Sequence, residues 1–245
     1  MNEEFNEVMN SASGTIEVPV TAEDINAFRI YADMLVETNK HMNLTAITDD
    51  KGIAMLHFID SLTLVHYLKS EQERQGREDI RVTDVGTGAG FPGIPLKIMV
   101  PGIDLTLMDS LAKRLKFLDE VTAELGLANV RTVHTRAEDA GRNSKFRERF
   151  DLAVARAVAP LPVLCEYCLP LVKPGGAFLA MKGHSEDEIK AANHAIIELG
   201  ATIEKTDEFT LPGTDNTRSV IVVRKLRPTP AKYPRKAGVP SKNPL

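Results

Sequence analysis

Short apolar runs alternate with amphipathic segments from Ile80 to Leu226. The runs have the length of buried strands, and the segments between them carry apolar residues at helical spacing. The last two runs flank a Pro-Gly-Thr-Asp-Asn-Thr loop that suits a hairpin, so we expect an antiparallel last strand. The pattern predicts an α/β fold with a mostly parallel, seven-stranded sheet. The expected strands are Ile80–Val85, Asp104–Asp109, Val130–Thr135, Asp151–Ala157, Ala177–Lys182, Thr202–Leu211 and Arg218–Leu226.

Helices are expected between these strands, on both faces of the sheet. The first begins near Pro92, because proline is favoured in the first helical turn. The others span Ala112–Leu125, Leu161 to about Leu171, and Glu186–Leu199.

The N-terminal part of the chain is also predicted to be helical. Residues 1–20 are expected to form a frayed or loosely helical start. Thr21 and Asp24 are spaced as a capping box, and apolar residues follow at helical spacing. A second helical run extends from Ile53 to Leu68. We expect residues 1–75 to form a helical subdomain that packs on a second domain, residues 76–228.

Residues 229–245 are rich in proline and basic residues and lack apolar periodicity. We expect an extended basic C-terminal arm rather than a folded element. Seven Lys or Arg and no acid lie between Arg224 and Leu245, whereas the first 24 residues hold six acids and no Lys or Arg. The basic end is either a solvated tail or a surface for a polyanion.

The composition excludes several classes of protein. No apolar run approaches the ~18 residues of a membrane span, and the acidic start is wrong for a secretory signal. Two cysteines argue against a disulfide scaffold and fit a reducing cytoplasm. Cys165 and Cys168 fall inside an expected helix without a second cysteine pair, so we interpret them as buried core residues and expect no metal.

The glycine-rich stretch Asp84–Gly93 connects the first strand of the sheet to its helix. Gly88-x-Gly90-x-x-Gly93, with Asp109 about 20 residues on, formally matches a dinucleotide-binding turn. An Asp-x-Gly-x-Gly-x-Gly turn also suits S-adenosylmethionine. Asp84 favours the second interpretation, because a carboxylate repels a pyrophosphate and attracts the ammonium of a methionine moiety. Its alternative role is a carboxylate that caps the helix or the turn.

Other polar residues follow the expected strands. Asp109 ends the second strand, where it is placed to accept hydrogen bonds from ribose hydroxyls. The segment around Ala137 and Glu138 follows the third strand and is expected to reach the adenine side of a ligand. Arg156 ends the fourth strand and faces the pocket mouth, either in a structural salt bridge or to position a substrate base or phosphate.

A series of motifs resembles one known family. The chain is similar, in order and spacing, to the RsmG (GidB) family of bacterial 16S rRNA guanine-N7 methyltransferases, which have a Rossmann-like class I methyltransferase fold. The resemblance runs from about Thr21 to the C-terminus. One departure is the absence of any Trp, where the family often has one before the Asn of the N-terminal helix. The motifs are Asn43-Leu44-Thr45, His57-Phe58-x-Asp60-Ser61-Leu62, Asp84-Val85-Gly86-x-Gly88-x-Gly90-Phe91-Pro92-Gly93, Asp109-Ser110-x-x-Lys113-Arg114-x-x-Phe117-Leu118, Arg136-Ala137-Glu138, Asp151-x-x-x-Ala155-Arg156-Ala157 and Tyr233-Pro234-Arg235.

The resemblance implies methyl transfer from S-adenosylmethionine to N7 of a guanine in the 530 loop of 16S rRNA. Together with the residues above, it implies cofactor contacts at Asp84, Gly86, Gly88, Phe91, Asp109, Ala137, Glu138 and Arg156.

The expected chemistry needs no general base, because guanine N7 carries a free lone pair and the leaving group is a neutral thioether. Positioning for in-line attack is then the main task of the enzyme. Asn43, Asp60 and Arg156 are the candidates for stabilising the transition state. Because N7 lies in the deep groove of A-form RNA, the target base is expected to be unpaired or flipped out.

The expected partner is 16S rRNA, within a small-subunit ribosomal particle, and the protein is expected to act as a cytoplasmic monomer. Candidate phosphate contacts are Lys182, Arg218, Lys232 and Arg235. Two alternatives stay open: a methyltransferase for a small molecule or protein, and a non-catalytic module that binds a nucleotide or RNA.

Overall fold

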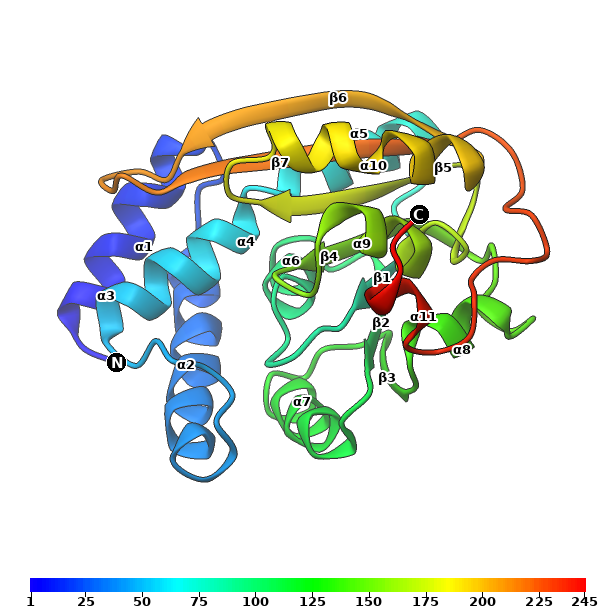
Figure 1. The fold of residues 1–245 in the computed structure, drawn as a ribbon. Coiled ribbons are helices and arrows are strands. Elements are labelled where there is room, and N and C mark those ends of the chain that lie inside the picture. Colours follow the sequence, from blue (N-terminus) through cyan, green and yellow to red (C-terminus); the bar gives the residue numbers. More distant parts are fainter.

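The computed structural model describes residues 1–245 and contains one seven-stranded sheet with the order β3-β2-β1-β4-β5-β7-β6 (Figure 1). Strand β7 pairs antiparallel with both of its neighbours, and the other pairs are parallel. The predicted mostly parallel sheet with an antiparallel last strand is therefore confirmed. The strands are β1 Arg81–Val85, β2 Asp104–Asp109, β3 Val130–His134, β4 Phe150–Arg156, β5 Val172–Lys182, β6 Ala201–Thr210 and β7 Thr217–Lys225.

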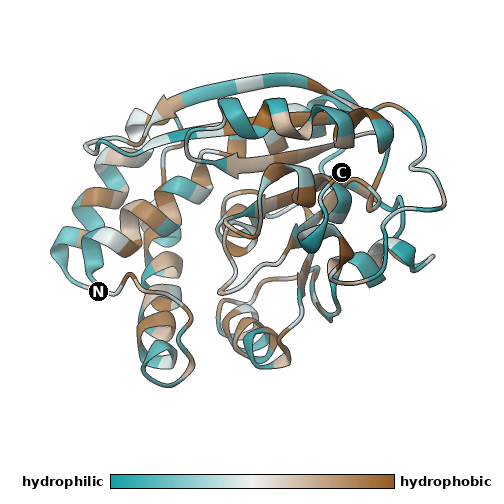
Figure 2. Cartoon of the chain, in the orientation of Figure 1, coloured by the Kyte–Doolittle hydropathy of each residue, from teal (hydrophilic) through white to brown (hydrophobic).

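Helices cover both faces of the sheet. One face packs against α8 Ala137–Arg142, α9 Leu161–Cys168 and α10 Glu186–Glu198. The other face shares one apolar core with α6 Gly93–Met99, α7 Ala112–Glu124 and the N-terminal helices. Figure 2 shows that edge strand β6 is mostly hydrophilic, in keeping with its largely exposed side chains. No helix combines the length and the apolar composition that crossing a membrane requires.

The first residues form a helix, which was one of the two expected alternatives, but this helix is packed against the core rather than frayed or loose. Helix α1 spans Glu3–Thr15 and begins with Asn2, whose side chain accepts a hydrogen bond from the amide of Phe5. Phe5 and Met9, one helical turn apart, are fully buried. The ring of Phe5 meets that of Phe58 edge-on at 5.8 Å. This apolar pair ties the start of the chain to the core.

Helix α2, Ala22–Met42, has the predicted capping box, in which Thr21 and Asp24 exchange side-chain and backbone hydrogen bonds. Its Tyr31 is fully buried and donates a hydrogen bond to the carbonyl of Ala89. The Tyr31 ring also stacks on Phe91, with centroids 5.2 Å apart. Helix α2 therefore supports the glycine-rich turn from beneath.

The expected single helix Ile53–Leu68 is interrupted. A short helix α3, Asp50–Gly52, leads into a π-helix η1, Ile53–Ile59, and then into α4, Asp60–Leu62. The chain breaks at Thr63 and Leu64 before α5, Val65–Gln75. Segments of π-helix are rare and are frequent at functional sites.

Smaller differences concern element ends. Strand β5 begins at Val172, before the Lys-Pro-Gly-Gly sequence that was expected to precede it, and α9 ends at Cys168. The segment after β3 is the helix α8 rather than a loop. Cys165 and Cys168 are unpaired and fully buried in α9, as expected, and burial raises the pKa of both thiols.

The C-terminal segment, residues 229–245, has little regular structure apart from α11, Val239–Lys242. It is nevertheless folded against the domain, in contrast to a free arm. Tyr233 is buried, and Arg235 makes a bidentate ion pair with the buried Glu166 of α9. Figure 1 shows this segment, in red, with its helix α11 near α8.

Candidate active site

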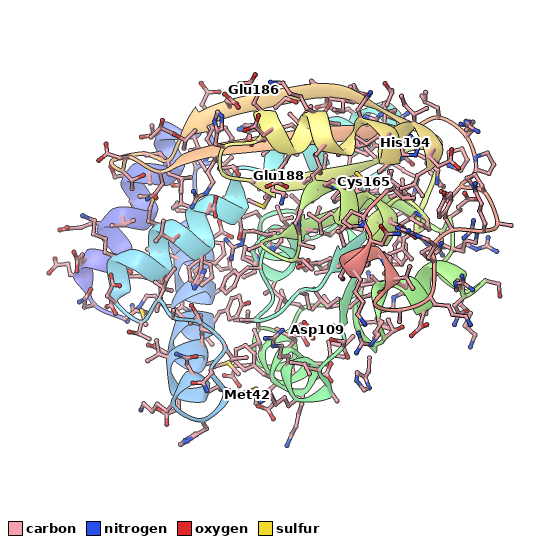
Figure 3. The ribbon with its side chains drawn as sticks, in the orientation of Figure 1. Met42, Asp109, Cys165, Glu186, Glu188 and His194 are labelled. Carbon is pink, nitrogen blue, oxygen red and sulfur yellow. The ribbon has the colours of Figure 1, made fainter.

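A cavity of about 440 Å³ lies at the carboxyl ends of β1, β2 and β4, where ligands bind in open α/β sheets. Figure 3 shows Asp109 at the end of β2, near the start of α7. Most of the predicted cofactor residues line this cavity: Gly86, Gly88, Phe91, Asp109, Ala137, Glu138 and Arg156. The walls are completed by residues that include Leu44, Thr45, His57, Met108, Arg136, Val158 and Tyr167.

A larger cavity, about 640 Å³, lies between α5 and strands β5–β7. It contains none of the predicted site residues. Its charged residues are already paired, as with Arg224, which binds both Glu71 and Glu204. We therefore place the site in the smaller cavity.

The four glycines of the turn have different surroundings. Gly86 and Gly88 line the cavity with φ of +70° and +59°, a backbone conformation that favours glycine. A Cβ on Gly86 would stand 2.9 Å from a methyl group of Val158. Gly90 and Gly93 point into the protein, because a Cβ on them would meet the Tyr31 hydroxyl at 2.4 Å and the Asp84 carboxylate at 2.8 Å.

Asp84 lies beneath the turn and is fully buried, outside the wall of the cavity. Its Oδ2 accepts hydrogen bonds from the Thr87 hydroxyl at 2.7 Å and the Gly93 amide at 2.9 Å. Its Oδ1 is buried without a partner. Burial raises the pKa of Asp84 to about 6, against the opposing effects of these hydrogen bonds and of Arg156. In this structure the carboxylate caps α6 and braces the turn.

Asp109 is buried at the edge of the cavity, as expected from its place at the end of β2. Its Oδ2 accepts a hydrogen bond from the Gly88 amide at 3.0 Å, and Oδ1 accepts one from the Leu111 amide at 2.9 Å. Arg114 lies 3.4 Å from the same carboxylate. These bonds fix the carboxylate beside the glycine turn, so that its remaining lone pairs are available to a ligand.

Ala137 and Glu138 are the first two residues of the short helix α8, and both line the cavity. The carboxylate of Glu138 is buried and accepts a hydrogen bond from the amide of Gly238 at 2.8 Å. Tyr167 of α9 also lines the cavity and shares a hydrogen bond of 2.7 Å with the Ser241 hydroxyl. The C-terminal segment therefore contacts two residues of the wall.

Arg156 joins β4 to the π-helix on the opposite side of the cavity. Its Nη1 donates to the carbonyl oxygens of Leu56 and His57 at 3.0 and 3.4 Å. The same nitrogen lies 3.2 Å from Oδ2 of Asp60, whose Oδ1 accepts from Nε of Arg218 at 2.9 Å. Asp60 is thus held between two arginines outside the cavity wall. Of the three catalytic candidates, only Arg156 lines the cavity.

Asn43 is exposed and ends α2 in a left-handed conformation, φ +51°. The following residues, Leu44 and Thr45, line the cavity instead. Their amides are held by Asn39 Oδ1 at 2.6 and 2.9 Å. Asn39 and Asn43 therefore shape the loop rather than face the cavity.

His57 is a cavity residue to which the sequence assigned no role, although it opens one of the quoted motifs. Its ring stacks on Phe91, with centroids 4.6 Å apart and an interplanar angle of 15°. Nε2 lies 2.8 Å from the Thr45 hydroxyl and Nδ1 lies 3.3 Å from Arg156. Burial, and secondarily the charge of Arg156, lowers the pKa of His57 to about 4. The ring is therefore neutral at physiological pH.

The four predicted RNA-binding residues all have acidic partners and lie at two places. Lys182 at the end of β5 pairs with Glu188 at 2.7 Å, and Arg218 at the start of β7 pairs with Asp60. Both lie at the cavity edge of the sheet, that is, at the end of its strands nearest the cavity. Lys182 pairs in the β5–β7 register with Ser219, the residue that follows Arg218. Lys232 pairs with Glu198 near the opposite edge, and Arg235 is engaged by Glu166.

No group of three or more His, Cys, Asp or Glu side chains is arranged to hold a metal ion.

Comparison with known proteins identifies the family. Residues 24–217 match the family model for rRNA small subunit methyltransferase G, GidB. This chain belongs to that family. It is 51% identical to ribosomal RNA small subunit methyltransferase G of Acetivibrio thermocellus over 238 residues, which is 97% of this chain and 95% of the relative. It is 52% identical to the protein of the same name from Lactobacillus johnsonii, over 89% of this chain and 90% of the relative.

Solved structures of other proteins share the fold. One is a 16S rRNA adenine-N1 methyltransferase from Catenulisporales acidiphilia, crystallised with the cosubstrate SAM, with a TM-score of 0.51 and 16% identity over 66% of this chain and 93% of that one. Another is TrmN from Thermus thermophilus, with a TM-score of 0.50 and 19% identity over 71% and 53% of the two chains. The expected class I methyltransferase fold is confirmed.

Proposed function

We propose that this protein transfers a methyl group from S-adenosylmethionine to N7 of a guanine in the 530 loop of 16S rRNA. Membership of the rRNA small subunit methyltransferase G family carries the proposal. The position and the specific atom rest on the motif resemblance. The cavity at the carboxyl ends of the strands supports it, because most of the predicted cofactor residues line that cavity.

The glycine turn fits S-adenosylmethionine better than a dinucleotide. A dinucleotide turn brings its second glycine against the pyrophosphate and leaves the helix N-terminus free for it. Here Gly90 is packed under Tyr31, and the Gly93 amide at the start of α6 is already bonded to Asp84. A pyrophosphate would meet a carboxylate at that position, whereas a cationic methionine moiety would be attracted.

The donor would be held along the wall from Gly86 to Glu138. Because Gly86 and Gly88 carry no Cβ, a ligand can approach the backbone closely there, and Asp109 offers acceptor lone pairs for ribose hydroxyls. Ala137 and Glu138 would hold the adenine side, and Phe91 and Arg156 border the other end. Asp84 would act through charge from beneath the turn. When bound, S-adenosylmethionine supplies an electrophilic methyl group on a sulfonium.

The residues of the chain provide positioning rather than proton transfer. N7 has no proton to lose, and the neutral His57 is not needed as a base. The His57–Phe91 stack and the Thr45 hydroxyl contribute uncharged groups to the lining of the cavity. Arg156 holds His57 in place by contacts with the Nδ1 atom of the His57 ring and with the His57 carbonyl oxygen. Such fixed geometry is what an in-line attack on a methyl group requires.

We propose Lys182 and Arg218 as the first phosphate contacts, because they lie at the cavity edge of the sheet. Lys232, whose side chain is 66% exposed, and Arg235 are more remote candidates. The substrate would be a single-stranded or flipped-out guanine in rRNA or a small-subunit particle, and the enzyme would act in the cytoplasm, where that RNA is found.

Methyl transfer from labelled S-adenosylmethionine tests the proposal. The substrates are deproteinised 16S rRNA, partly assembled particles and whole small subunits, each lacking the modification. We expect label in at least one of them, at a guanine of the 530 loop that becomes cleavable by N7-methylguanine chemistry. An Asp109→Ala variant is the control for the cofactor site. Label at another base, or none in any substrate with protein that binds S-adenosylmethionine, would refute the proposed substrate.

A further inference from the structure

The C-terminal segment is anchored by charged side chains, one of which, Glu166, is fully buried. Arg147, which follows α8, donates hydrogen bonds of 2.7 Å to the carbonyls of Thr229 and Tyr233. Arg142 donates to the carbonyl of Pro234 at 2.7 Å. Glu166 is fully buried and has Arg235 as its ion-pair partner. Because an unpaired buried carboxylate is costly, these contacts hold the segment in one place.

Beyond these anchors, the chain reaches the wall of the cavity. The amide of Gly238 donates to Oε1 of Glu138 at 2.8 Å, and α11 places Ser241 within 2.7 Å of the Tyr167 hydroxyl. Both contacted residues line the cavity. They are 100 and 74 residues away in sequence from their partners. Gly238 takes a left-handed conformation, φ +81°, which turns its amide toward Glu138.

The contact with Gly238 restricts a side chain that its own helix holds weakly. Helix α8 has six residues, too few for a rigid element without tertiary support. The Gly238 amide engages one carboxylate oxygen of Glu138, so the other oxygen keeps a fixed direction relative to the cavity. A ligand donor that meets a preoriented acceptor avoids the entropy of ordering it.

We infer that residues 238–241 are a positioning element of the methyl-donor site, acting through Glu138 and Tyr167. This inference rests on the proposed function, since it takes the cavity as the S-adenosylmethionine site. Arg235 then serves as an anchor of this element, through Glu166. The segment is part of the donor pocket, independently of any contact with RNA.

A truncation after Ala237 tests this inference, because it keeps the Arg235–Glu166 pair and removes Gly238 and Ser241. By calorimetry we expect it to weaken S-adenosylmethionine about tenfold, the order expected for one hydrogen bond to a charged group. Methylthioadenosine, which has the same adenosine half, should lose the same factor. A truncation after Lys242, which shortens the chain but keeps both contacts, should bind like the full chain.

A double-mutant cycle separates positioning from general damage to the fold. If the segment acts through Glu138 and Tyr167, the truncation after Ala237 should, in a Glu138→Ala background, weaken binding only by the smaller factor that belongs to the Tyr167–Ser241 bond. Ser241→Ala and Tyr167→Phe, which leave the fold intact, should each weaken binding by a smaller and equal factor. Because both substitutions remove the same Tyr167–Ser241 hydrogen bond, the double variant should bind S-adenosylmethionine no more weakly than either single variant.

Additive losses in the cycle, or full donor affinity after the truncation, would overturn the inference. Failure of the full-length protein to bind S-adenosylmethionine would instead overturn the proposed function. A loss of rRNA binding with unchanged donor affinity would show that the segment is an RNA contact and not a part of the donor site.

Discussion

The imidazole of His57 lies parallel to the ring of Phe91, with centroids 4.6 Å apart. Arg156 stands over the same phenyl ring, 5.2 Å from its centroid, and donates to the His57 carbonyl. A protonated imidazole at this place would be buried beside a guanidinium. The arrangement therefore selects the neutral form of His57.

The free energy of unfolding should depend on pH because His57 is held in its neutral form in the folded protein. Its pKa falls from 6.5 to about 4 on folding, so the unfolded chain binds more protons between these values. This contribution is complete above the unfolded pKa and is lost as pH falls toward the folded one, by about 3 kcal/mol at most. Urea titrations of wild type and His57→Gln should diverge over this window. An imidazole pKa above 6 by NMR would contradict the prediction.

Asp84 should change the stability of the fold with pH in the direction opposite to that of His57. Its pKa rises from 3.8 to about 6, so the folded state binds more protons and stability falls as pH rises through this window. Relative to wild type, Asp84→Asn should gain about 3 kcal/mol between acidic and alkaline pH. The variant should also bind S-adenosylmethionine more weakly at pH above 6, where it lacks the negative charge. Because His57 and Asp84 oppose each other, each must be measured against its own variant. Parallel stability curves for Asp84→Asn and wild type would refute this prediction.

Gly86→Val should abolish donor binding while the sheet still folds. The new side chain would collide with Val158 and needs a left-handed backbone, φ +70°. Gly126→Val is the matched control, because Gly126 has φ +60° with no atom within 4 Å of an added Cβ. Both variants should lose about 1–3 kcal/mol of stability through backbone strain. Calorimetry should show lost affinity for Gly86→Val alone, and equal affinities in the two variants would mean that the donor binds elsewhere.

Lys182→Gln and Arg218→Gln should each weaken binding to 16S rRNA and reduce the slope of log affinity against log salt by roughly one. Donor affinity should stay unchanged. Lys190→Gln is the control, because Lys190 also pairs with a glutamate, at 2.8 Å, but has an exposed side chain on α10. Lys232→Gln should have a smaller effect than Arg218→Gln. Filter-binding titrations over a range of salt concentrations decide this, and an effect of Lys190→Gln as large as that of Lys182→Gln would reject the proposed contacts.

The sequence predicts both the sheet and the site residues that lie at strand ends, because both predictions depend on locating the strands. Strand ends can be predicted from apolar runs, and in a parallel sheet their carboxyl ends meet on one side, so the sequence predicts the positions of Asp109 and Arg156. The sequence does not reveal in which direction the side chain of a residue near a strand end points. Asp84 points inward, because the first amide of α6, that of Gly93, needs an acceptor.

Elements held by distant side chains escape local patterns. The π-helix at Ile53–Ile59 has ordinary helical composition, and its Leu56 and His57 carbonyls accept hydrogen bonds from Arg156 of β4. The C-terminal segment has no periodicity and is fixed by Glu166 and Arg147. For α1 a signal was present, since Phe5 and Met9 are spaced by one helical turn.

Tyr31 and Gly90 occupy one shared space, since the Tyr31 hydroxyl fills the position that a Cβ on Gly90 would take. The two positions are therefore coupled in any change of sequence. A larger residue at position 90 is admissible only together with the loss of the hydroxyl at position 31, and that loss also removes the bond to Ala89. A substitution at position 90 of the turn therefore requires a substitution at position 31 of α2.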